Sequence, residues 1–289
     1  MSNELTAFEK IPVKIFKNSD AGAAYVADEI ASLIKSRQKE GKYCVLGLAT
    51  GSTPTRLYDE LVKRHKAGLS FRNVYTFNLD EYYPIHKDSL QSYVRFMNEH
   101  LFDHLDIPKK NIHIPDGQLP KEEIEEFCKA YEDKIEALGG IDIQVLGIGR
   151  TGHIGFNEPG SSEKSSTRLI TLDQVTRLDA ASDFFGEENV PRRAITMGVG
   201  SILRAKKAFM MAWGEGKAPI IQKAVEGPVT DQIPSSFLQN HADAVVIVDE
   251  AASSELKRIK TPWLLDGVEK WNDKLIKKAV VWLCQHLNK

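Results

Sequence analysis

Short apolar runs that alternate with helix-like segments most limit how this chain can fold. Each run is too short for a buried helix and is bounded by Gly, Pro, Ser or charged residues. Continuous runs of this kind are typical of strands that are buried on both faces of a parallel sheet. They cover residues 12–16, 43–48, 74–79, 208–213, 244–248 and the start of 141–159.

The segments between these runs are long enough to be crossover helices. Apolar residues recur at helical spacing in residues 23–34, and similar patterns cover 92–105, 121–138 and 218–225. Strand, helix and strand in this order predict an α/β fold with one doubly wound, mostly parallel sheet, a Rossmann-like three-layer sandwich. Because no repeat or linker interrupts the pattern, we expect a single domain over residues 1–289.

Charge and cysteine content exclude several classes of protein. The formal net charge is −2, so nothing attracts the whole chain to nucleic acid or to an anionic membrane. The three cysteines are far apart and indicate neither a disulfide framework nor a cysteine-rich zinc site. The first residues lack an apolar signal core, and no run approaches the ~18 apolar residues of a membrane span. We therefore expect a cytoplasmic protein.

A small, hydroxyl-rich turn follows the second apolar run. Thr50, Gly51, Ser52 and Thr53 lead into a helix whose first turn holds Pro54. Free backbone N–H groups, the positive end of the helix dipole and the hydroxyls make such a turn a phosphate site. The turn matches neither a dinucleotide fingerprint nor an ATP-binding P-loop. The alternative is an ordinary connection between a strand and a helix.

Acids stand at the end of the third run. Asp80 and Glu81 follow residues 74–79, and they face the same crevice as the phosphate turn if the sheet is parallel. Acids at strand ends also serve as helix or loop caps, so that reading stays open.

The stretch 141–159 joins a buried strand to a glycine-rich turn. It delivers His153, Asn157 and Glu158 within six residues of one another. An imidazole and a carboxylate at the end of a buried strand suit proton transfer near neutral pH. The alternative is a flexible glycine loop with a solvated histidine.

Three further segments have two readings each. Residues 160–190 are polar and suit a mobile lid over a cleft, or a passive surface excursion. Lys217 follows another strand and can reach a phosphate as a point charge, or is a surface charge. The basic, helical tail 263–289 docks on the domain, or leads to a partner or a further segment.

Five segments resemble the glucosamine-6-phosphate deaminase family, also called glucosamine-6-phosphate isomerases. They are LGLATGSTPTRLYDEL, VYTFNLDEYY, GHIGFNEP, ITMGVGSIL and GKAPIIQKAVEG, in the family's order, and the resemblance covers roughly residues 13–257. The related 6-phosphogluconolactonases share the phosphate turn and a GxxGH turn. The sugar-binding domains of certain sugar-responsive regulators share the fold.

The resemblance implies that glucosamine 6-phosphate becomes fructose 6-phosphate and ammonia, a step of amino-sugar catabolism. It places Asp80 as the base that carries a proton from C2 to C1. It implies that His153 and Glu158 open the pyranose ring, and that Ser52, Thr53 and Lys217 hold the phosphate. It calls for no metal and no organic cofactor.

Several positions depart from the family pattern. Thr151 stands where the family usually carries an Asp that orients the histidine, and Ser182 and Asp183 replace a lid arginine that clamps the phosphate. Arg150 is unusual in its turn, and we expect it to reach an anion or an acid in the crevice. Ser161 and Arg168 match lid or effector positions.

Two other functions stay open beside the deaminase. The first is a same-fold enzyme that acts on another sugar phosphate, such as a 6-phosphogluconolactonase-like hydrolase. The second is a non-catalytic sugar-phosphate-binding domain. The expected partner is a small sugar phosphate, with a homo-oligomer or an additional domain docked on the C-terminal helix.

Overall fold

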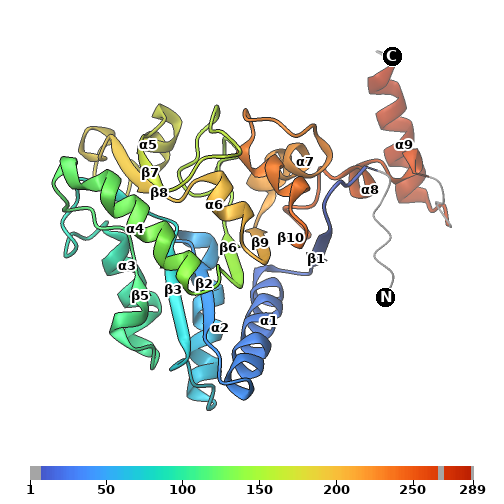
Figure 1. Ribbon diagram of the computed structural model, residues 1–289. Helices are drawn as coiled ribbons and strands as arrows, with labels where there is room; N and C mark the ends of the chain where they lie inside the picture. The colour runs from blue at the N-terminus through green and yellow to red at the C-terminus, as the bar shows by residue number, and fades with distance from the viewer. Residues whose placement is uncertain (1–7, 266–269, 288–289) are drawn as a thin grey trace.

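The computed structural model describes residues 8–265 and 270–287. Its centre is a seven-stranded parallel sheet in the order β1-β10-β9-β6-β2-β3-β5 (Figure 1). The strands are β1 (Val13–Phe16), β2 (Cys44–Leu48), β3 (Val74–Asn78), β5 (Ile112–His113), β6 (Ile143–Leu146), β9 (Lys207–Ala212) and β10 (Ala244–Asp249). The strand order reverses between β2 and β6, and the carboxyl ends of such a pair form the usual ligand crevice of an open α/β sheet.

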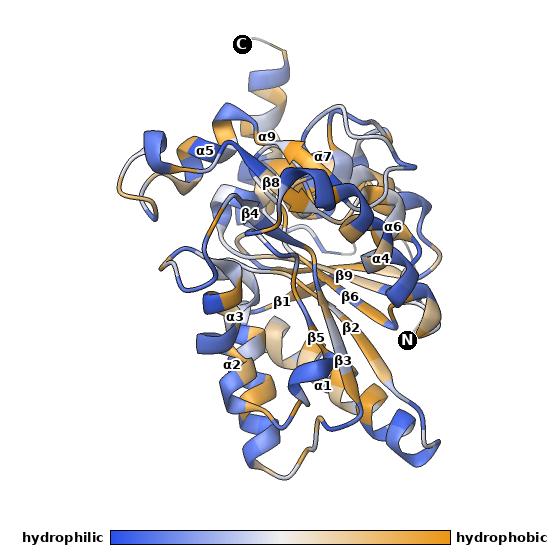
Figure 2. Ribbon diagram, turned by 60° about the vertical axis from the view of Figure 1, so that its left-hand side comes forward, coloured by the Kyte–Doolittle hydropathy of each residue, from blue (hydrophilic) through white to orange (hydrophobic). Residues whose placement is uncertain are grey.

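Helices cover both faces of this sheet, so the predicted doubly wound architecture is confirmed. One buried cluster joins the strands to α1 (Ser19–Lys39), α2 (Ser52–Lys66) and α3 (Tyr93–His100). The other joins them to α4 (Ile124–Ala137), α6 (Val199–Leu203) and α7 (Ala218–Glu226). Figure 2 shows hydrophobic central strands between these helical layers. Short 3-10 helices cover Phe102–His104, Lys109–Asn111, Lys121–Glu123, Glu187–Asn189, Glu215–Lys217, Pro234–Asn240 and Pro262–Leu264.

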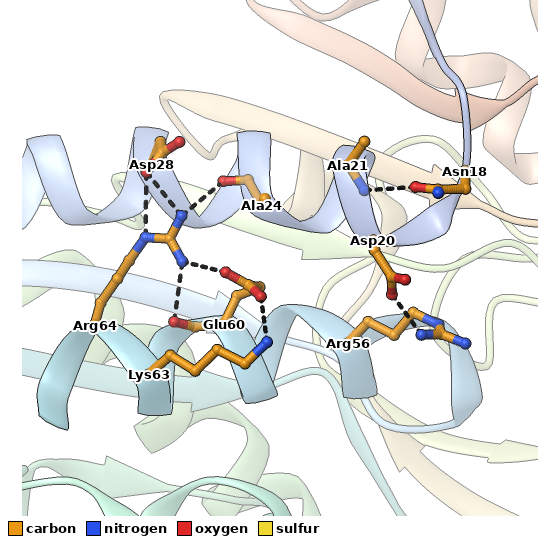
Figure 3. Close-up of polar contacts among 9 residues, drawn as sticks. All are labelled: Asn18, Asp20, Ala21, Ala24, Asp28, Arg56, Glu60, Lys63 and Arg64. Carbon is orange, nitrogen blue, oxygen red and sulfur yellow. Dashed lines mark hydrogen bonds and ion pairs between the residues drawn. The ribbon is translucent and has the colours of Figure 1, made fainter. Parts of the chain in front are cut away.

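Helices α1 and α2 run side by side and are joined by polar contacts on their outer surface (Figure 3). The Asn18 side chain caps α1 by accepting a hydrogen bond from the Ala21 N–H at 2.9 Å. Arg64 of α2 lies 2.8 Å from Asp28 of α1, and Arg56 pairs with Asp20. These pairs align the helix whose first turn faces the crevice.

A second, antiparallel sheet was not predicted. It has the order β4-β8-β7 and consists of β4 (Asp80–Tyr83), β8 (Arg193–Thr196) and β7 (Arg168–Thr171). Asp80 and Glu81 follow the end of β3, as expected, and they also begin the further strand β4. The lid segment supplies β7 and the helix α5 (Gln174–Ala180). Strand β7 is an only partly buried edge, so it lacks the continuous apolar run by which the buried strands are recognised.

The chain ends in α8 (Lys257–Lys260) and α9 (Asp273–His286). Figure 1 shows α9 standing away from the central sheet, beyond α8. Its apolar residues Ile276, Val280 and Leu283 are exposed, whereas Trp282 packs against Trp263 with ring centroids 5.9 Å apart. Residues 266–269 and 288–289 of the predicted tail lie outside the described residues. Within 8–265 and 270–287, no helix is both long and apolar enough to cross a membrane.

Candidate active site

A cavity of about 190 Å³ lies where the strand order reverses. It brings together the phosphate turn after β2, the start of β4 and the glycine turn after β6. Its lining residues are Ala49, Thr50, Gly51, Ser52, Thr53, Leu79, Asp80, Tyr93, Gly147, Ile148, Gly149, His153, Gly155 and Phe156. Half of the predicted site residues therefore line one cavity, namely Thr50, Gly51, Ser52, Thr53, Asp80 and His153. Thr151, Glu158, Lys217, Arg150, Ser161 and Arg168 lie behind or beside this lining.

The phosphate turn presents the bare N-terminus of α2 to the cavity. Gly51, the residue before the helix, has φ +100°, a conformation that side chains rarely allow, and it offers no side chain as a cap. The first helical turn holds no acidic residue. The indole N–H of Trp213 donates to the Thr53 carbonyl at 3.0 Å and secures this end of the helix. The N–H groups of this turn are therefore suited to an anion.

Asp80 presents a buried carboxylate to the cavity. It is 5% exposed, and in the small sheet it lies opposite Thr196 of β8. Burial and the neighbouring charge of Glu81 raise the pKa of Asp80 to about 8, and no hydrogen bond from the part of the chain that the structure describes offsets these two effects. A carboxyl group with such a pKa can both accept and return a proton near neutral pH.

Glu81, the neighbouring acid, serves as a cap. Its carboxylate accepts hydrogen bonds from the N–H groups of Tyr93 and Val94 at the start of α3, each at 3.1 Å, and from the Ser92 hydroxyl at 3.0 Å. Burial still raises the pKa of Glu81 to about 7, against these bonds. The sequence left open whether these acids face the crevice or cap a helix. In the structure Glu81 caps the start of α3, and Asp80 faces the cavity.

His153 also lines the cavity, in the turn after β6. Its Nδ1 lies 3.0 Å from the Thr151 hydroxyl and 3.3 Å from a carboxylate oxygen of Glu158. Nε2 lies beside Gly149, where a Cβ would approach it to 2.1 Å, so only glycine leaves room for the ring. Burial raises the pKa of Glu158, but the hydrogen bond and charge of His153, together with the Thr176 hydroxyl and the Asp173 N–H, outweigh it, so that pKa lies below its ordinary value.

Buried polar contacts fix the rest of this turn. The Asn157 amide donates to the carbonyls of Ile154 at 2.9 Å and Met197 at 2.8 Å, and its oxygen accepts from Arg168 at 2.9 Å. Arg168 also donates to the Ser161 hydroxyl at 3.2 Å. Ser161 and Arg168 thus lie together behind the turn. Arg168 also lines a separate hollow of about 560 Å³ beside α4.

Two predicted cations are engaged by protein groups. Lys217 donates to the Ile148 carbonyl at 2.8 Å, and burial lowers its pKa. Arg150 lies 2.5 Å from Asp179 of the lid helix α5. Lys217 therefore lies next to the cavity wall, whereas Arg150 points to the lid.

Sequence reasoning did not name two of the residues that line the cavity, Tyr93 and Phe156. Their aromatic rings stack with centroids 6.0 Å apart. The helical pattern of residues 92–105 predicts α3. Nothing in this local pattern shows that Tyr93, the first residue of the helix, lines the cavity. Within residues 8–265 and 270–287, no three His, Cys, Asp or Glu side chains gather closely enough to hold a metal ion.

Known proteins share both the sequence and the fold. The family model described as glucosamine-6-phosphate isomerases/6-phosphogluconolactonase matches residues 17–247. A glucosamine-6-phosphate deaminase of Shewanella woodyi is 49% identical over 245 residues, which are 84% of this chain and 90% of that protein. A glucosamine-6-phosphate deaminase-like protein of Bacteroides thetaiotaomicron is 52% identical over 97% of this chain, but the chain spans only 42% of its length.

Solved structures agree with these matches. A monomeric glucosamine-6-phosphate deaminase, 39% identical, superposes with a TM-score of 0.81 over 85% of this chain and all of that one. A 6-phosphogluconolactonase of Thermotoga maritima, 23% identical, covers 83% of this chain and 99% of its own with a TM-score of 0.64, which is a likeness of fold. The chain belongs to the family of glucosamine-6-phosphate isomerases and 6-phosphogluconolactonases.

Proposed function

We propose that this chain is an enzyme that deaminates and isomerises glucosamine 6-phosphate. Water is consumed, and fructose 6-phosphate and ammonia are released, in amino-sugar catabolism. The observation that carries the proposal is one cavity that joins a bare helix N-terminus, a buried carboxylate and a histidine paired with a carboxylate. Two relatives named glucosamine-6-phosphate deaminase, which are 48% and 49% identical to this chain, support the same reaction.

The phosphate is held at the start of α2. The N–H groups after Gly51 and the hydroxyls of Thr50, Ser52 and Thr53 surround an anion there. Lys217 adds a positive charge from the neighbouring wall. Binding energy from this remote group orients the reacting carbons toward Asp80 and His153.

His153 opens the pyranose ring by moving a proton from O1 to O5. Imidazole suits this step because it titrates near neutral pH. Glu158 faces Nδ1 and stabilises the imidazolium form by charge, and Thr151 adds a hydroxyl contact. Since Thr151 carries no charge, we expect slower turnover than in an enzyme with a carboxylate at this position.

Asp80 then removes the proton from C2 and returns it to C1. The C1 aldehyde oxygen takes up a proton and the C2 ammonium group gives one up, so that the ring-opened aldose becomes a ketose imine at C2. Water then hydrolyses the imine to the ketone and ammonia. In the resting site the raised pKa keeps Asp80 largely protonated at pH 7. The ammonium group at C2 of the substrate is a cation next to this carboxyl group, and it favours the ionised form that acts as base.

The test is release of ammonia and fructose 6-phosphate from glucosamine 6-phosphate by the purified chain. Turnover in the wild type that is lost in Asp80→Asn supports the proposal. Hydrolysis of a sugar-phosphate lactone without deamination identifies the 6-phosphogluconolactonase-like alternative. Saturable binding of sugar phosphate without turnover of either substrate identifies a binding domain.

The proposal also covers the domain boundaries, the lid and the location of the protein. We propose one α/β domain over residues 1–289, with a lid at 160–190, in a cytoplasmic protein. We also propose that Ser161 and Arg168 serve the lid or an anionic effector, because the half-buried Arg168 guanidinium contacts an amide, a hydroxyl and a carbonyl but no carboxylate among the described residues.

The tail helix α9 is proposed as a docking element for an additional folded unit. Ile276, Val280, Leu283 and Leu287 are exposed at positions i, i+4, i+7 and i+11, a spacing typical of helix packing. The match to the Bacteroides protein covers 97% of this chain and hence at least part of α9, and that protein is more than twice as long. Titration with the remaining part of that protein, against a Leu283→Asp variant, tests the proposal. Self-association through α9 would instead indicate a homo-oligomer.

A further inference from the structure

The lid helix α5 buries few of its own side chains against the turn that carries His153. Thr176 is the one buried residue of this seven-residue helix, and Leu178 is 52% exposed. The nine-residue helix α7, in contrast, buries six residues, among them Ile220, Ile221 and Val225. Apolar contacts lie at the two ends of the segment, where Leu172, Ala180 and Phe184 share one cluster with Phe156. The position of the exposed helix between these ends depends on polar contacts.

Polar contacts tie α5 to the turn that carries His153, and the Thr176 hydroxyl of the helix helps to lower the pKa of Glu158. At the start of the helix, Glu158 accepts a hydrogen bond from the Asp173 N–H at 3.4 Å. Near its end, Asp179 pairs with Arg150 at 2.5 Å. The contacts of Arg177 go to Leu172 and Glu187 and so remain inside the lid segment.

We infer that Arg150 and Asp179 form a latch that keeps α5 docked on the turn and so holds Glu158 against His153. Arg150 and Asp179 are positioning residues, because neither lines the cavity. The link runs through Glu158, which contacts the helix with one carboxylate oxygen and His153 with the other. The structural part of this inference stands alone, and its catalytic consequence rests on the proposed function.

The expected effect is modest, because both partners are exposed, Arg150 at 63% and Asp179 at 46%. Exposed pairs shift an equilibrium by about two- to five-fold. In this protein the equilibrium that shifts is the one between docked and undocked α5. A third charged group nearby is Lys217. Burial lowers its pKa, Asp179 raises it and Arg150 lowers it. A change of Arg150 to a neutral residue leaves Lys217 to attract Asp179, so charge reversal is the sharper test.

Hydrogen exchange of the lid tests the latch without any substrate. Arg150→Glu and Asp179→Arg should each speed exchange of the amides of residues 173–183 by about two- to five-fold. The double variant R150E/D179R restores opposite charges and should return exchange toward the wild-type rate. Lys42→Glu, at a pair of similar exposure with Glu40 remote from the lid, is the control and should leave lid exchange unchanged. Wild-type exchange in both single variants, or a double variant as fast as the singles, would overturn the latch.

Kinetics test the positioning of Glu158. With glucosamine 6-phosphate, each single variant should lower kcat by a factor similar to the rise in lid exchange and change KM less, and the double variant should recover kcat. Faster lid exchange with an unchanged kcat would overturn the positioning role. If the wild type shows no turnover, the proposed function fails, and the exchange experiment still decides the latch.

Discussion

His153 Nδ1 lies 3.3 Å from a carboxylate oxygen of Glu158 and 3.0 Å from the hydroxyl of Thr151. The two partners compete for one ring nitrogen, but only Glu158 carries a charge. The side chains of His153 and Glu158 are 17% and 13% exposed, so their interaction is weakly screened by solvent. This arrangement assigns the electrostatic part of histidine orientation to Glu158 and leaves Thr151 a secondary contact.

We therefore expect kcat to fall when Thr151 loses its hydroxyl group and to rise when Thr151 is replaced by a carboxylate. Thr151→Val removes the hydroxyl contact with little change of shape and should lower kcat about three- to ten-fold, the cost of one hydrogen bond. Thr151→Asp places a second carboxylate at Nδ1 and should raise kcat. Steady-state kinetics on glucosamine 6-phosphate measure both. If Thr151→Asp slows the enzyme while Thr151→Val does not, Glu158 already orients the ring fully.

Asp80→Asn should remove the proton carrier while keeping the shape of the site. General acid–base catalysis by a positioned side chain contributes roughly 10²–10⁴-fold, so kcat should fall within that range. Binding of inorganic phosphate, measured by calorimetry, should be nearly unchanged, because the phosphate turn lies on a different element. A variant that retains more than a tenth of the wild-type kcat would show that another group moves the C2 proton.

The same variant predicts a change of stability with pH. The pKa of Asp80 rises from 3.8 to about 8 on folding, so between these values the folded state binds more protons than the unfolded state. Stability of the wild type is therefore lost as pH rises from about 4 to about 8. Asparagine cannot ionise, so Tm of Asp80→Asn minus Tm of the wild type should be larger at pH 9 than at pH 5. Equal differences at both pH values would contradict a buried carboxylate that ionises in this range.

Gly51→Ala should weaken phosphate binding and stability together. Gly51 has φ +100° and ψ −179°, a region that is nearly restricted to glycine and costs other residues about 1–3 kcal/mol. Relief of this strain would move the first N–H groups of α2, so Kd for phosphate should rise by at least about ten-fold. Gly41→Ala is the matched control, with φ +67° and open space around a Cβ. It should destabilise the fold without changing phosphate affinity.

Local pattern alone determined much of this protein. The apolar runs identified six of the seven strands of the parallel sheet, because strands buried on both faces are apolar along most of their length. The two-residue edge strand β5 was missed, because it is only partly buried and has no such run. The same alternation of runs and helices predicted the three layers. The turn after β2 was recognisable because a helix N-terminus with a glycine before it has a distinctive composition.

The tertiary structure decided what distant segments do to one another. Only the fold separates Asp80 from Glu81, because the bonds from α3 that occupy Glu81 come from residues eleven to thirteen positions away. The small sheet escaped prediction since β7 is a polar edge strand whose partner comes from a later segment. Arg150 shows most clearly which contacts the sequence alone does not predict. Its position in the turn is local information, but its partner Asp179 is 29 residues away, and only packing of the lid onto the turn brings the two charges together.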